Sequence, residues 1–215
     1  MTYSIVARDP ATDAVGVATA TAGPAVGSLV PHARAGVGAV ATQAMTNPYL
    51  AFDSLRLLEV LGAEEALARV LSQDGDREQR QIILIDRHGE SAGWTGRSCE
   101  AYAGHLTHHD VAVAGNIIAG PHVLAAMMEA YEGQPGPLED RLMRGLAAGK
   151  SAGGDTRGTG SAALKIFTTE EYPSIDLRVD LSTNAISDLS QLLDVTVSGS
   201  YADFLREVPR RHRRG

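Results

Sequence analysis

A nearly uncharged stretch is the feature that most limits the folds open to this chain. From Ala14 to Phe52 there is a single charged residue, Arg34. Gly, Ala, Thr, Pro and Gln dominate the stretch and three prolines interrupt it, so it holds no run of ~20 strongly apolar residues that would span a membrane. Uncharged runs of small residues are typical of strands covered on both faces. We therefore expect inner strands of a sheet sandwich in which small side chains permit close packing.

Composition describes a globular chain of 215 residues, 44% hydrophobic and 21% charged. A chain of this length can bury roughly 70% of its unfolded surface, so we expect one domain, over residues 2–208. The 26 acidic and 19 basic residues give a net charge of −7, which argues against a nucleic-acid binder. Four of the arginines stand in the last six residues. We expect residues 209–215 to be a disordered basic tail, with contact to an acidic partner or membrane surface as the alternative.

A single cysteine, Cys99, limits both the chemistry and the compartment. It excludes an internal disulfide and every multi-cysteine zinc or iron–sulfur site. No signal peptide is evident, because Asp9 and Pro10 interrupt the apolar start of the chain. These features favour a reducing cytoplasm.

Hydrophobic periodicity predicts paired strands alternating with paired helices. Strands are expected over residues 3–8, 15–21, 35–44, 81–86, 91–95, 111–115, 161–168 and 175–181. Helical spacing follows Pro48 as two helices separated by Gly62, returns over 122–131 and 137–149, and begins again near Ala185. Paired strands with paired helices favour two antiparallel sheets packed face to face, with helices outside. The expected fold is therefore a four-layer α/β/β/α sandwich.

Thr2 carries the most mechanistic content. Initiator methionine is generally removed before a small residue, which would leave Thr2 with a free α-amine beside its own hydroxyl. An α-amine with a reference pKa of ~7.7–8.0 can accept the hydroxyl proton and activate the oxygen as a nucleophile. The dipeptide Met1-Thr2 also begins many ordinary cytosolic proteins. Here, however, Thr2 leads directly into the first predicted strand.

Several motifs occur in the order found in one bacterial family. They are Thr2-Tyr-Ser-Ile-Val-Ala-Arg-Asp9, Gly36-Val-Gly-Ala-Val-Ala-Thr-Gln43, Asn47-Pro48, Trp94-Thr-Gly96, Ala103-Gly104, Gly115-Asn116-Ile-Ile-Ala-Gly120, Gly153-Gly-Asp-Thr-Arg-Gly158 and Ser161-Ala-Ala-Leu164. The chain thereby resembles the family called domain of unknown function 1028, placed in the N-terminal nucleophile (Ntn) hydrolase-like superfamily. The resemblance implies a fold like that of proteasome β subunits and amide-bond hydrolysis by a terminal nucleophile.

The N-terminal segment of the chain departs from the pattern of proteasome β subunits at two points. The second strand carries no carboxylate, and Arg34 stands where a lysine would fall. Arg34 can supply a positive field near Thr2 but cannot deprotonate; a partly buried structural cation is the alternative. Asn116 ends a strand, where its amide and the adjacent backbone N–H groups are candidate donors to an oxyanion, or it is simply a turn former.

The glycine-rich loop over residues 153–160 has two interpretations. Its glycines let the backbone approach a ligand, with Asp155 orienting an amine and Arg157 holding a carboxylate. Alternatively, Asp155 and Arg157 form a structural pair that stiffens the loop. The loop lacks the phosphate-binding pattern of a P-loop.

A histidine-rich segment suggests metal chemistry, but only weakly. His105, His108 and His109 stand beside Asp110. Adjacent histidines on a strand point to opposite sides, so a closed site would need further ligands and we expect no metal. Cys99 has no evident activating partner and is expected to be a small buried residue, and Trp94 a packing residue or a pocket wall.

These observations lead to one functional hypothesis and one alternative. We expect an Ntn-type hydrolase that cleaves an amide bond of a small molecule or peptide without a cofactor. Thr2, Arg34 and Asn116 are its candidate catalytic residues, and Asp155 and Arg157 its candidate substrate contacts. The alternative is a non-catalytic ligand-binding or assembly protein on the same fold. We expect no nucleic-acid or membrane partner, and pairing of the chain with itself through a helical face.

Overall fold

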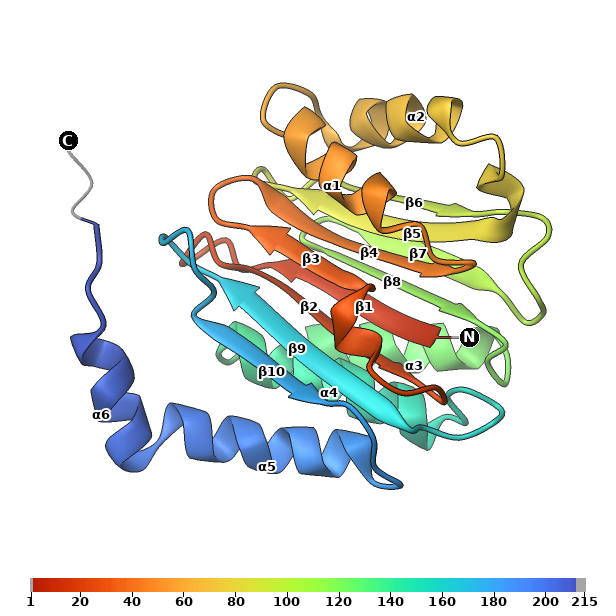
Figure 1. Cartoon of the computed structure of the whole chain (residues 1–215). Coiled ribbons are helices and arrows are strands. Elements are labelled where there is room, and N and C mark those ends of the chain that lie inside the picture. Colours follow the sequence, from red (N-terminus) through yellow and green to blue (C-terminus); the bar gives the residue numbers. More distant parts are fainter. Residues whose placement is uncertain (1, 212–215) are drawn as a thin grey trace.

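The computed structural model describes residues 2–211, which form two antiparallel sheets packed face to face (Figure 1). The six-stranded sheet has the order β10-β9-β2-β1-β8-β7 and the four-stranded sheet the order β3-β4-β5-β6. The strands are β1 (Thr2–Arg8), β2 (Val15–Thr21), β3 (Pro31–Arg34), β4 (Gly38–Ala44), β5 (Arg80–Asp86), β6 (Ser91–Thr95), β7 (Gly104–His108), β8 (Val111–Asn116), β9 (Ser161–Phe167) and β10 (Ile175–Val179).

Helices cover the outer face of each sheet. The four-stranded sheet carries α1 (Pro48–Leu57) and α2 (Ala63–Gln73), and the six-stranded sheet carries α3 (Pro121–Glu132), α4 (Leu138–Ser151) and α5 (Ala185–Val197). Short 3-10 turns occur at Val26–Ser28 and Arg77–Gln79, and α6 (Gly199–Glu207) follows α5. The predicted four-layer α/β/β/α sandwich is confirmed.

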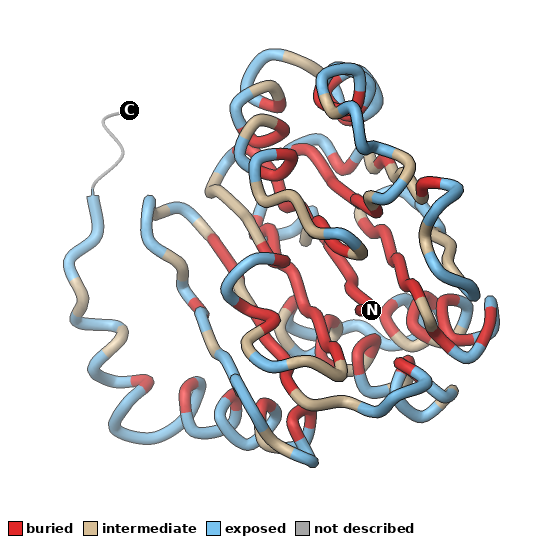
Figure 2. The backbone as a smooth tube through the Cα atoms, turned by 45° about the vertical axis from the view of Figure 1, so that its right-hand side comes forward, coloured by how far each residue is buried: buried red, intermediate tan, exposed pale blue. Residues whose placement is uncertain are grey.

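Side-chain alternation along β1 explains the hydrophobic layers on the two faces of the six-stranded sheet. Tyr3 and Ile5 face α3 and α4, whereas Val6 faces the four-stranded sheet. The buried run of β1 and its neighbours lies inside the molecule in Figure 2. Gly149 lets helix α4 lie close to both β1 and α3. A Cβ at this position would come within 3.3 Å of Tyr3 in β1 and within 2.8 Å of Met127 in α3. Burying residues on both faces of one sheet requires the uncharged composition seen in β2 and in β1 up to Ala7.

The structure departs from the predicted elements in four places. Strand β3 was not predicted; its four residues, Pro31–Arg34, pair with β4. The expected strand over 35–44 begins only at Gly38, because Gly36 adopts a φ of +68° in the turn that joins β3 to β4. Strand β7 was not predicted: it is an edge strand paired with β8 alone, and its outer residues are polar or exposed, so it shows no apolar pattern. The last helix breaks at Ser198, before Gly199 with a φ of +64°.

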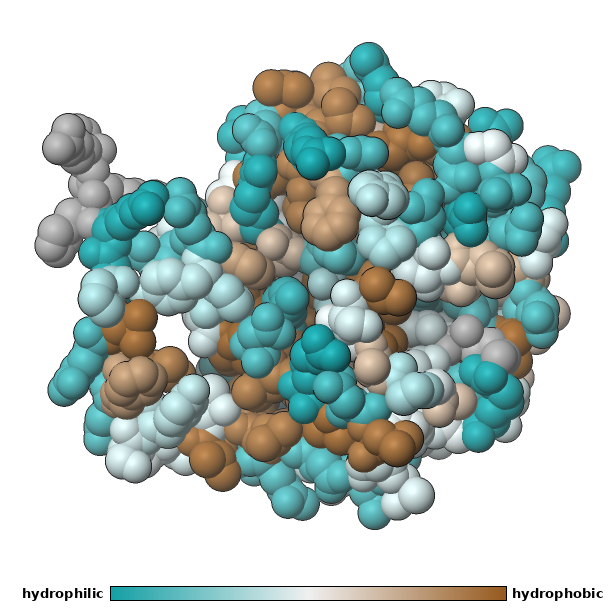
Figure 3. Space-filling model, viewed as in Figure 1, coloured by the Kyte–Doolittle hydropathy of each residue, from teal (hydrophilic) through white to brown (hydrophobic). Residues whose placement is uncertain are grey.

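The C-terminal helix contacts the body only lightly. Ala202 is the buried residue that α6 contributes within the described chain, and a cavity of about 490 Å³ lies between α6 and the body, visible at the left of Figure 3. Of the predicted tail, Pro209 accepts a hydrogen bond from Tyr172 at 2.9 Å and Arg211 pairs with Glu171 at 3.0 Å. Residues 212–215 lie outside the described part. No helix within residues 2–211 is both long and apolar enough to cross a membrane.

Candidate functional site at one end of the inter-sheet layer

The layer between the sheets changes from apolar to polar toward one end. Its apolar part includes Val6, Val17, Ala41, Ile83 and Ala114. Two residues further along the same strands, on the same face, the chain places buried polar side chains; these are Ser4, Thr19, Gln43, Gln81 and Asn116, with Thr2 and Thr21 beyond Ser4 and Thr19. Five strands from both sheets thus bring polar groups to one end.

A hydrogen-bond network joins these side chains, with Gln81 at its centre. Gln81 Oε1 accepts from Gln43 Nε2 at 2.7 Å and from Asn116 Nδ2 at 2.9 Å. Its Nε2 lies within hydrogen-bond distance of Thr95 Oγ1 and of the carbonyls of Gly104 and Gly115, at 2.9 to 3.0 Å. Gln81 is fully buried. It therefore connects β4 and β5 of one sheet with β7 and β8 of the other.

The network reaches β1 through Ser4. Its Oγ lies 2.6 Å from Gln43 Oε1 and 2.8 Å from Thr19 Oγ1. At the other side, Thr95 Oγ1 lies 2.9 Å from His105 Nδ1, and burial lowers the pKa of His105, which favours its neutral form. The described groups of this network are thus hydroxyls, amides and an imidazole that burial keeps neutral.

Thr2 is fixed from several directions. It is 5% exposed, its Oγ1 donates to Thr21 Oγ1 at 3.3 Å, and its carbonyl accepts from Gln43 Nε2 at 3.1 Å. Asn116 of β8 stands directly opposite in the strand register. The structure therefore brings together two of the predicted catalytic residues, Thr2 and Asn116.

Arg34 lies away from this end. It pairs in register with Gly38, at the opposite end of β4 from Gln43, which is on the order of 16 Å along the strand at ~3.3 Å per residue. Its guanidinium pairs with Glu59 and lies 3.4 Å from the Leu55 carbonyl. Because β3 runs antiparallel to β4, it carries Arg34 away from Thr2. The electrostatic partnership with Thr2 that the sequence suggested is not formed, and the structural-cation alternative describes its contacts.

The glycine-rich loop lies beside the polar end, and Asp155 holds it there. The buried Asp155 carboxylate accepts from the Ala22 N–H at 3.0 Å and from Arg157 Nε and Nη2 at 3.3 and 3.2 Å. Ala22 directly follows Thr21, so the loop is joined to the strand end next to Thr2. Arg157 is 43% exposed at its side chain. Of the two interpretations, the observed contacts are those of the structural pair; a substrate role for either residue stays a prediction.

Tyr3 is packed under the same loop. Its hydroxyl lies 3.5 Å from Thr159 Oγ1, and burial raises its pKa to about 12, with the negative charge of Asp155 acting in the same direction. Tyr3 is therefore a neutral structural group near neutral pH.

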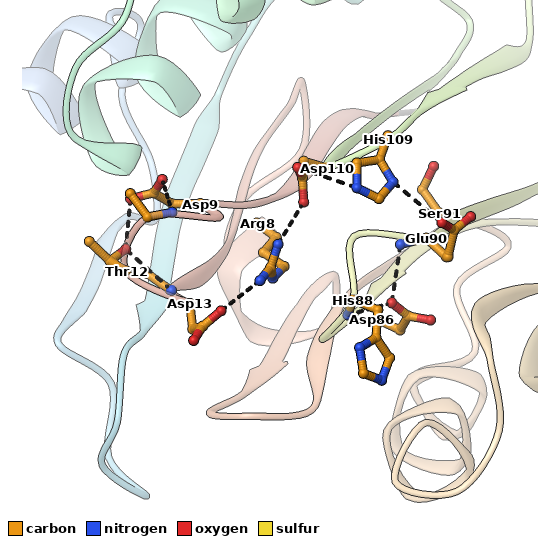
Figure 4. A network of polar contacts seen from close by, with 12 residues as sticks. Arg8, Asp9, Thr12, Asp13, Asp86, His88, Glu90, Ser91, His109 and Asp110 are labelled. Atoms are coloured by element: carbon orange, nitrogen blue, oxygen red, sulfur yellow. Dashed lines mark hydrogen bonds and ion pairs between the residues drawn. The ribbon is translucent and has the colours of Figure 1, made fainter.

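The histidines of the 105–110 segment face different partners. His105 contacts Thr95, and His108 Nδ1 lies 2.8 Å from Glu132. His109 stands between Glu90, at 3.4 Å, and Asp110, at 3.7 Å, at the opposite end of β1, where Arg8 also binds Asp110 (Figure 4). Within residues 2–211 no three His, Cys, Asp or Glu side chains gather as potential metal ligands.

Cys99 and Trp94 flank the four-stranded sheet. Cys99 is partly buried, its Sγ lies 3.3 Å from the Arg80 carbonyl, and burial raises the pKa of its thiol. Trp94 packs against the cluster beneath α1 and α2 and donates from Nε1 to the Arg77 carbonyl at 2.9 Å. Trp94 makes the contacts of a packing residue, whereas Cys99 is less buried than the sequence suggested.

Sequence reasoning missed the two amides at the centre of the site, Gln43 and Gln81. The alternation of side chains along a strand could have found them. Gln43 and Gln81 each lie near the end of an apolar strand, two residues from Ala41 and Ile83 respectively and therefore on the same buried face. A polar residue at a position where burial is expected requires a partner.

Known proteins match the chain in sequence and in structure. The model of a family of unknown function, DUF1028, matches residues 2–189. A crystal structure of a Silicibacter pomeroyi protein assigned to this family is 34% identical, with a TM-score of 0.91, covering 97% of this chain and 94% of that one. Anbu, the ancestral beta-subunit from Yersinia bercovieri, is 11% identical with a TM-score of 0.41, covering 98% of this chain and 99% of that one. Curated proteins give no match. The predicted family is confirmed: this chain belongs to the DUF1028 family.

Proposed function

We propose that this protein is an amide-bond hydrolase of the N-terminal nucleophile type, with Thr2 as its nucleophile after removal of Met1. The observation that carries the proposal is the position of Thr2. It begins a central strand, and its side chain faces the inter-sheet layer. At this end that layer is lined by uncharged polar side chains from five strands, namely Thr2, Thr21, Gln43, Gln81 and Asn116. The family resemblance implies the same type of chemistry.

The reaction is an acyl transfer in two steps. Thr2 Oγ1 attacks the amide carbonyl while the α-amine of Thr2 takes the hydroxyl proton, and that proton then passes to the departing amine as the C–N bond breaks. Water then attacks the resulting ester and gives a proton to the α-amine. The bond between the acyl carbon and Oγ1 breaks, and the α-amine passes its proton to Oγ1, which releases the acid and free Thr2. The substrate is a small molecule or a peptide, and the residues named here perform every step without a cofactor.

In this proposal the α-amine of Thr2 is the base without help from a lysine, since the described side chains of the network at this end are hydroxyls, amides and the His105 imidazole. Arg34 has no part in this proposal, because its contacts hold it at the far end of β4.

Asn116 is the proposed donor to the oxyanion. An amide nitrogen carries two donors, and one of those on Asn116 Nδ2 is directed to Gln81 Oε1 at 2.9 Å. This bond fixes the amide plane beside Thr2 before any substrate arrives, and removal of such a preorganised donor typically slows a reaction by about 10²–10³-fold. Asp155 holds the neighbouring loop, from which Arg157 is the proposed contact for substrate.

Labelling with a β-lactone, an electrophile that acylates hydroxyl nucleophiles, tests the proposal. We expect one adduct per chain on protein that lacks Met1. Thr2→Val, which removes the hydroxyl, is expected to abolish the adduct, whereas Thr2→Ser retains it. The matched control is a chain with an N-terminal extension, which keeps the Thr2 hydroxyl but removes its free amine. If extended and processed chains are labelled equally, the α-amine is not the base and the mechanism is wrong.

A second candidate is a non-catalytic ligand-binding protein on the same fold. The observation in its favour is that the amides of Gln43 and Gln81 are fully engaged with one another and with backbone carbonyls. Intact mass of purified protein separates the two candidates. A chain that retains Met1 has no free Thr2 amine and supports the binding protein.

The setting proposed for either function follows from the composition. The proposed compartment is the cytoplasm, because the chain has a single cysteine and so no internal disulfide. Self-association is proposed through a helical face: Leu192, Val195, Tyr201 and Phe204 of α5 and α6 are exposed apolar side chains.

A further inference from the structure

A cavity of about 410 Å³ lies beside β3, at the edge of the four-stranded sheet. Strand β3 packs against β2 and β9 of the larger sheet, and α1 lies above it (Figure 1). The larger sheet continues past this edge as β10. The cavity opens between β3, α1 and β9, and we call it the β3 pocket. Its volume falls within the range of ~300–1,000 Å³ that small-molecule sites occupy.

Three cations from three elements line the β3 pocket. They are Arg34 of β3, Arg56 of α1 and Lys165 of β9. No carboxylate stands among the described lining residues. The acidic partners of these cations, Glu59, Asp53 and Asp176, lie outside the lining. The pocket therefore presents positive charge that its own wall does not neutralise.

The ion pairs of the two arginines, Arg34 with Glu59 and Arg56 with Asp53, are open to competition. The side chains of Arg34 and Arg56 are 41% and 70% exposed, and their acidic partners are 51% and 45% exposed. Ion pairs of this exposure are weak, because water and salt screen them. A bound anion can therefore share these guanidinium groups with Glu59 and Asp53.

Aromatic side chains form another part of the wall. Phe52 is 46% exposed, and the His32 ring meets it edge to face with centroids 4.9 Å apart; Phe167 lies deeper. Burial lowers the pKa of His32, and the charge of Lys165 acts in the same direction. His32 is therefore a neutral ring near neutral pH, and its Nε2 is occupied 3.0 Å from the Leu29 carbonyl. An exposed phenylalanine in a cavity offers apolar area to a flat ligand.

We propose that the β3 pocket binds a small anion that carries a flat apolar group, with Arg34, Arg56 and Lys165 holding the anionic head and Phe52 covering the ring. Either a carboxylate or a phosphate monoester supplies the head, since guanidinium groups bind both. This site is separate from Thr2: Lys165 is in register with Val17, four residues from Thr21, or on the order of 13 Å along β2. Ligand binding in the β3 pocket therefore does not depend on the proposed hydrolysis at Thr2.

Titrations with benzoate and phenyl phosphate, followed by backbone amide NMR, test the proposal. We expect saturable shifts at Ala33, Phe52 and Phe167, with a Kd of about 1–10 mM for ligands of this size. Tighter binding of benzoate assigns a carboxylate head, and tighter binding of phenyl phosphate assigns a phosphate monoester. Equal affinity for neutral benzamide would overturn the role of the cations, and equal affinity for inorganic phosphate would overturn the role of the ring.

Two variants localise the binding. Arg56→Gln and Lys165→Met each remove one cation and are expected to weaken binding about tenfold, the effect of one charge-assisted hydrogen bond. Arg69→Gln is the matched control, because Arg69 forms a similar exposed pair with Glu65 on α2 but lies outside the pocket. Arg56 is so exposed that its variant tests the site even if Lys165→Met does not fold. Unchanged affinity in Arg56→Gln would refute the proposal.

Discussion

Gln81 is the residue on which the polar end of the inter-sheet layer depends, and Gln81→Met tests this dependence. Methionine preserves the length of the side chain but neither donates nor accepts as an amide does. The substitution leaves the Gln43 and Asn116 amides without the acceptor that each now has at 2.7 and 2.9 Å. It also removes the donor that reaches the Gly104 and Gly115 carbonyls.

The magnitude follows from the groups that lose partners. A buried donor without an acceptor costs about 1–3 kcal/mol, and two such donors give about 2–6 kcal/mol. Burial of the more apolar methionine offsets part of this loss, so we expect a net decrease near 3 kcal/mol in the free energy of unfolding. That is a large share of the ~5–15 kcal/mol that typically stabilises a domain.

Guanidinium unfolding followed by tryptophan fluorescence measures this decrease. Trp94 is the only tryptophan and pairs with Ile82, the neighbour of Gln81, so it reports on the same strands. The control is Gln73→Met at the exposed end of α2, expected within about 0.5 kcal/mol of wild type. If Gln81→Met lowers the free energy of unfolding by less than about 1 kcal/mol, or by no more than Gln73→Met does, the network does not stabilise the fold.

Four further predictions concern residues outside the Gln81 network. Asp155→Asn is expected to lower the free energy of unfolding by about 2–3 kcal/mol and to speed hydrogen exchange in residues 153–160, because the loop loses its buried charged acceptor; unchanged exchange there would contradict the structural role. Burial raises the pKa values of Tyr3 and Tyr131 from 10.0 to about 12, so the folded state holds their protons longer than the unfolded state and stability falls as pH rises from 10 to about 12, by about 1.4 kcal/mol per pH unit for each tyrosine. Tyr131→Phe should remove its share of that slope in alkaline unfolding curves, and an unchanged slope would count against the assignment. Burial also raises the pKa of the Cys99 thiol, so iodoacetamide should alkylate it more slowly in the folded than in the unfolded chain near neutral pH; equal rates would show a reactive thiolate. Arg34→Gln should leave the rate of Thr2 labelling unchanged, and a loss of labelling in that folded variant would restore Arg34 to the site.

Much of the fold was predictable because its determinants are local. The alternation of Tyr3, Ile5 and Val6, the turn at Asp9 and Pro10, and the uncharged strands each point to one layered arrangement. What escaped prediction depended on tertiary context. Strand β7 is a polar edge strand that only its pairing with β8 defines.

The candidate site shows the same difference between residues that local sequence predicts and residues that only tertiary packing defines. Thr2 and Asn116 were predicted and lie opposite each other, because both stand at ends of neighbouring strands. Gln43 and Gln81 were missed, since their partners arise from stacking one sheet on the other. Arg34 was misplaced for a related reason: its distance from Thr2 depends on the direction of β3, which its residue type does not reveal.

Peptide-level mass spectrometry of β-lactone-treated protein shows whether Thr2, once Met1 is removed, is a nucleophile. We expect the N-terminal peptide to begin at Thr2 and to carry the acyl group on the Thr2 side chain. The adduct should be absent from Thr2→Val and from the N-terminally extended chain. Retention of Met1, or an adduct that maps to Cys99 or to another hydroxyl while Thr2 stays unmodified, would show that Thr2 is not the nucleophile.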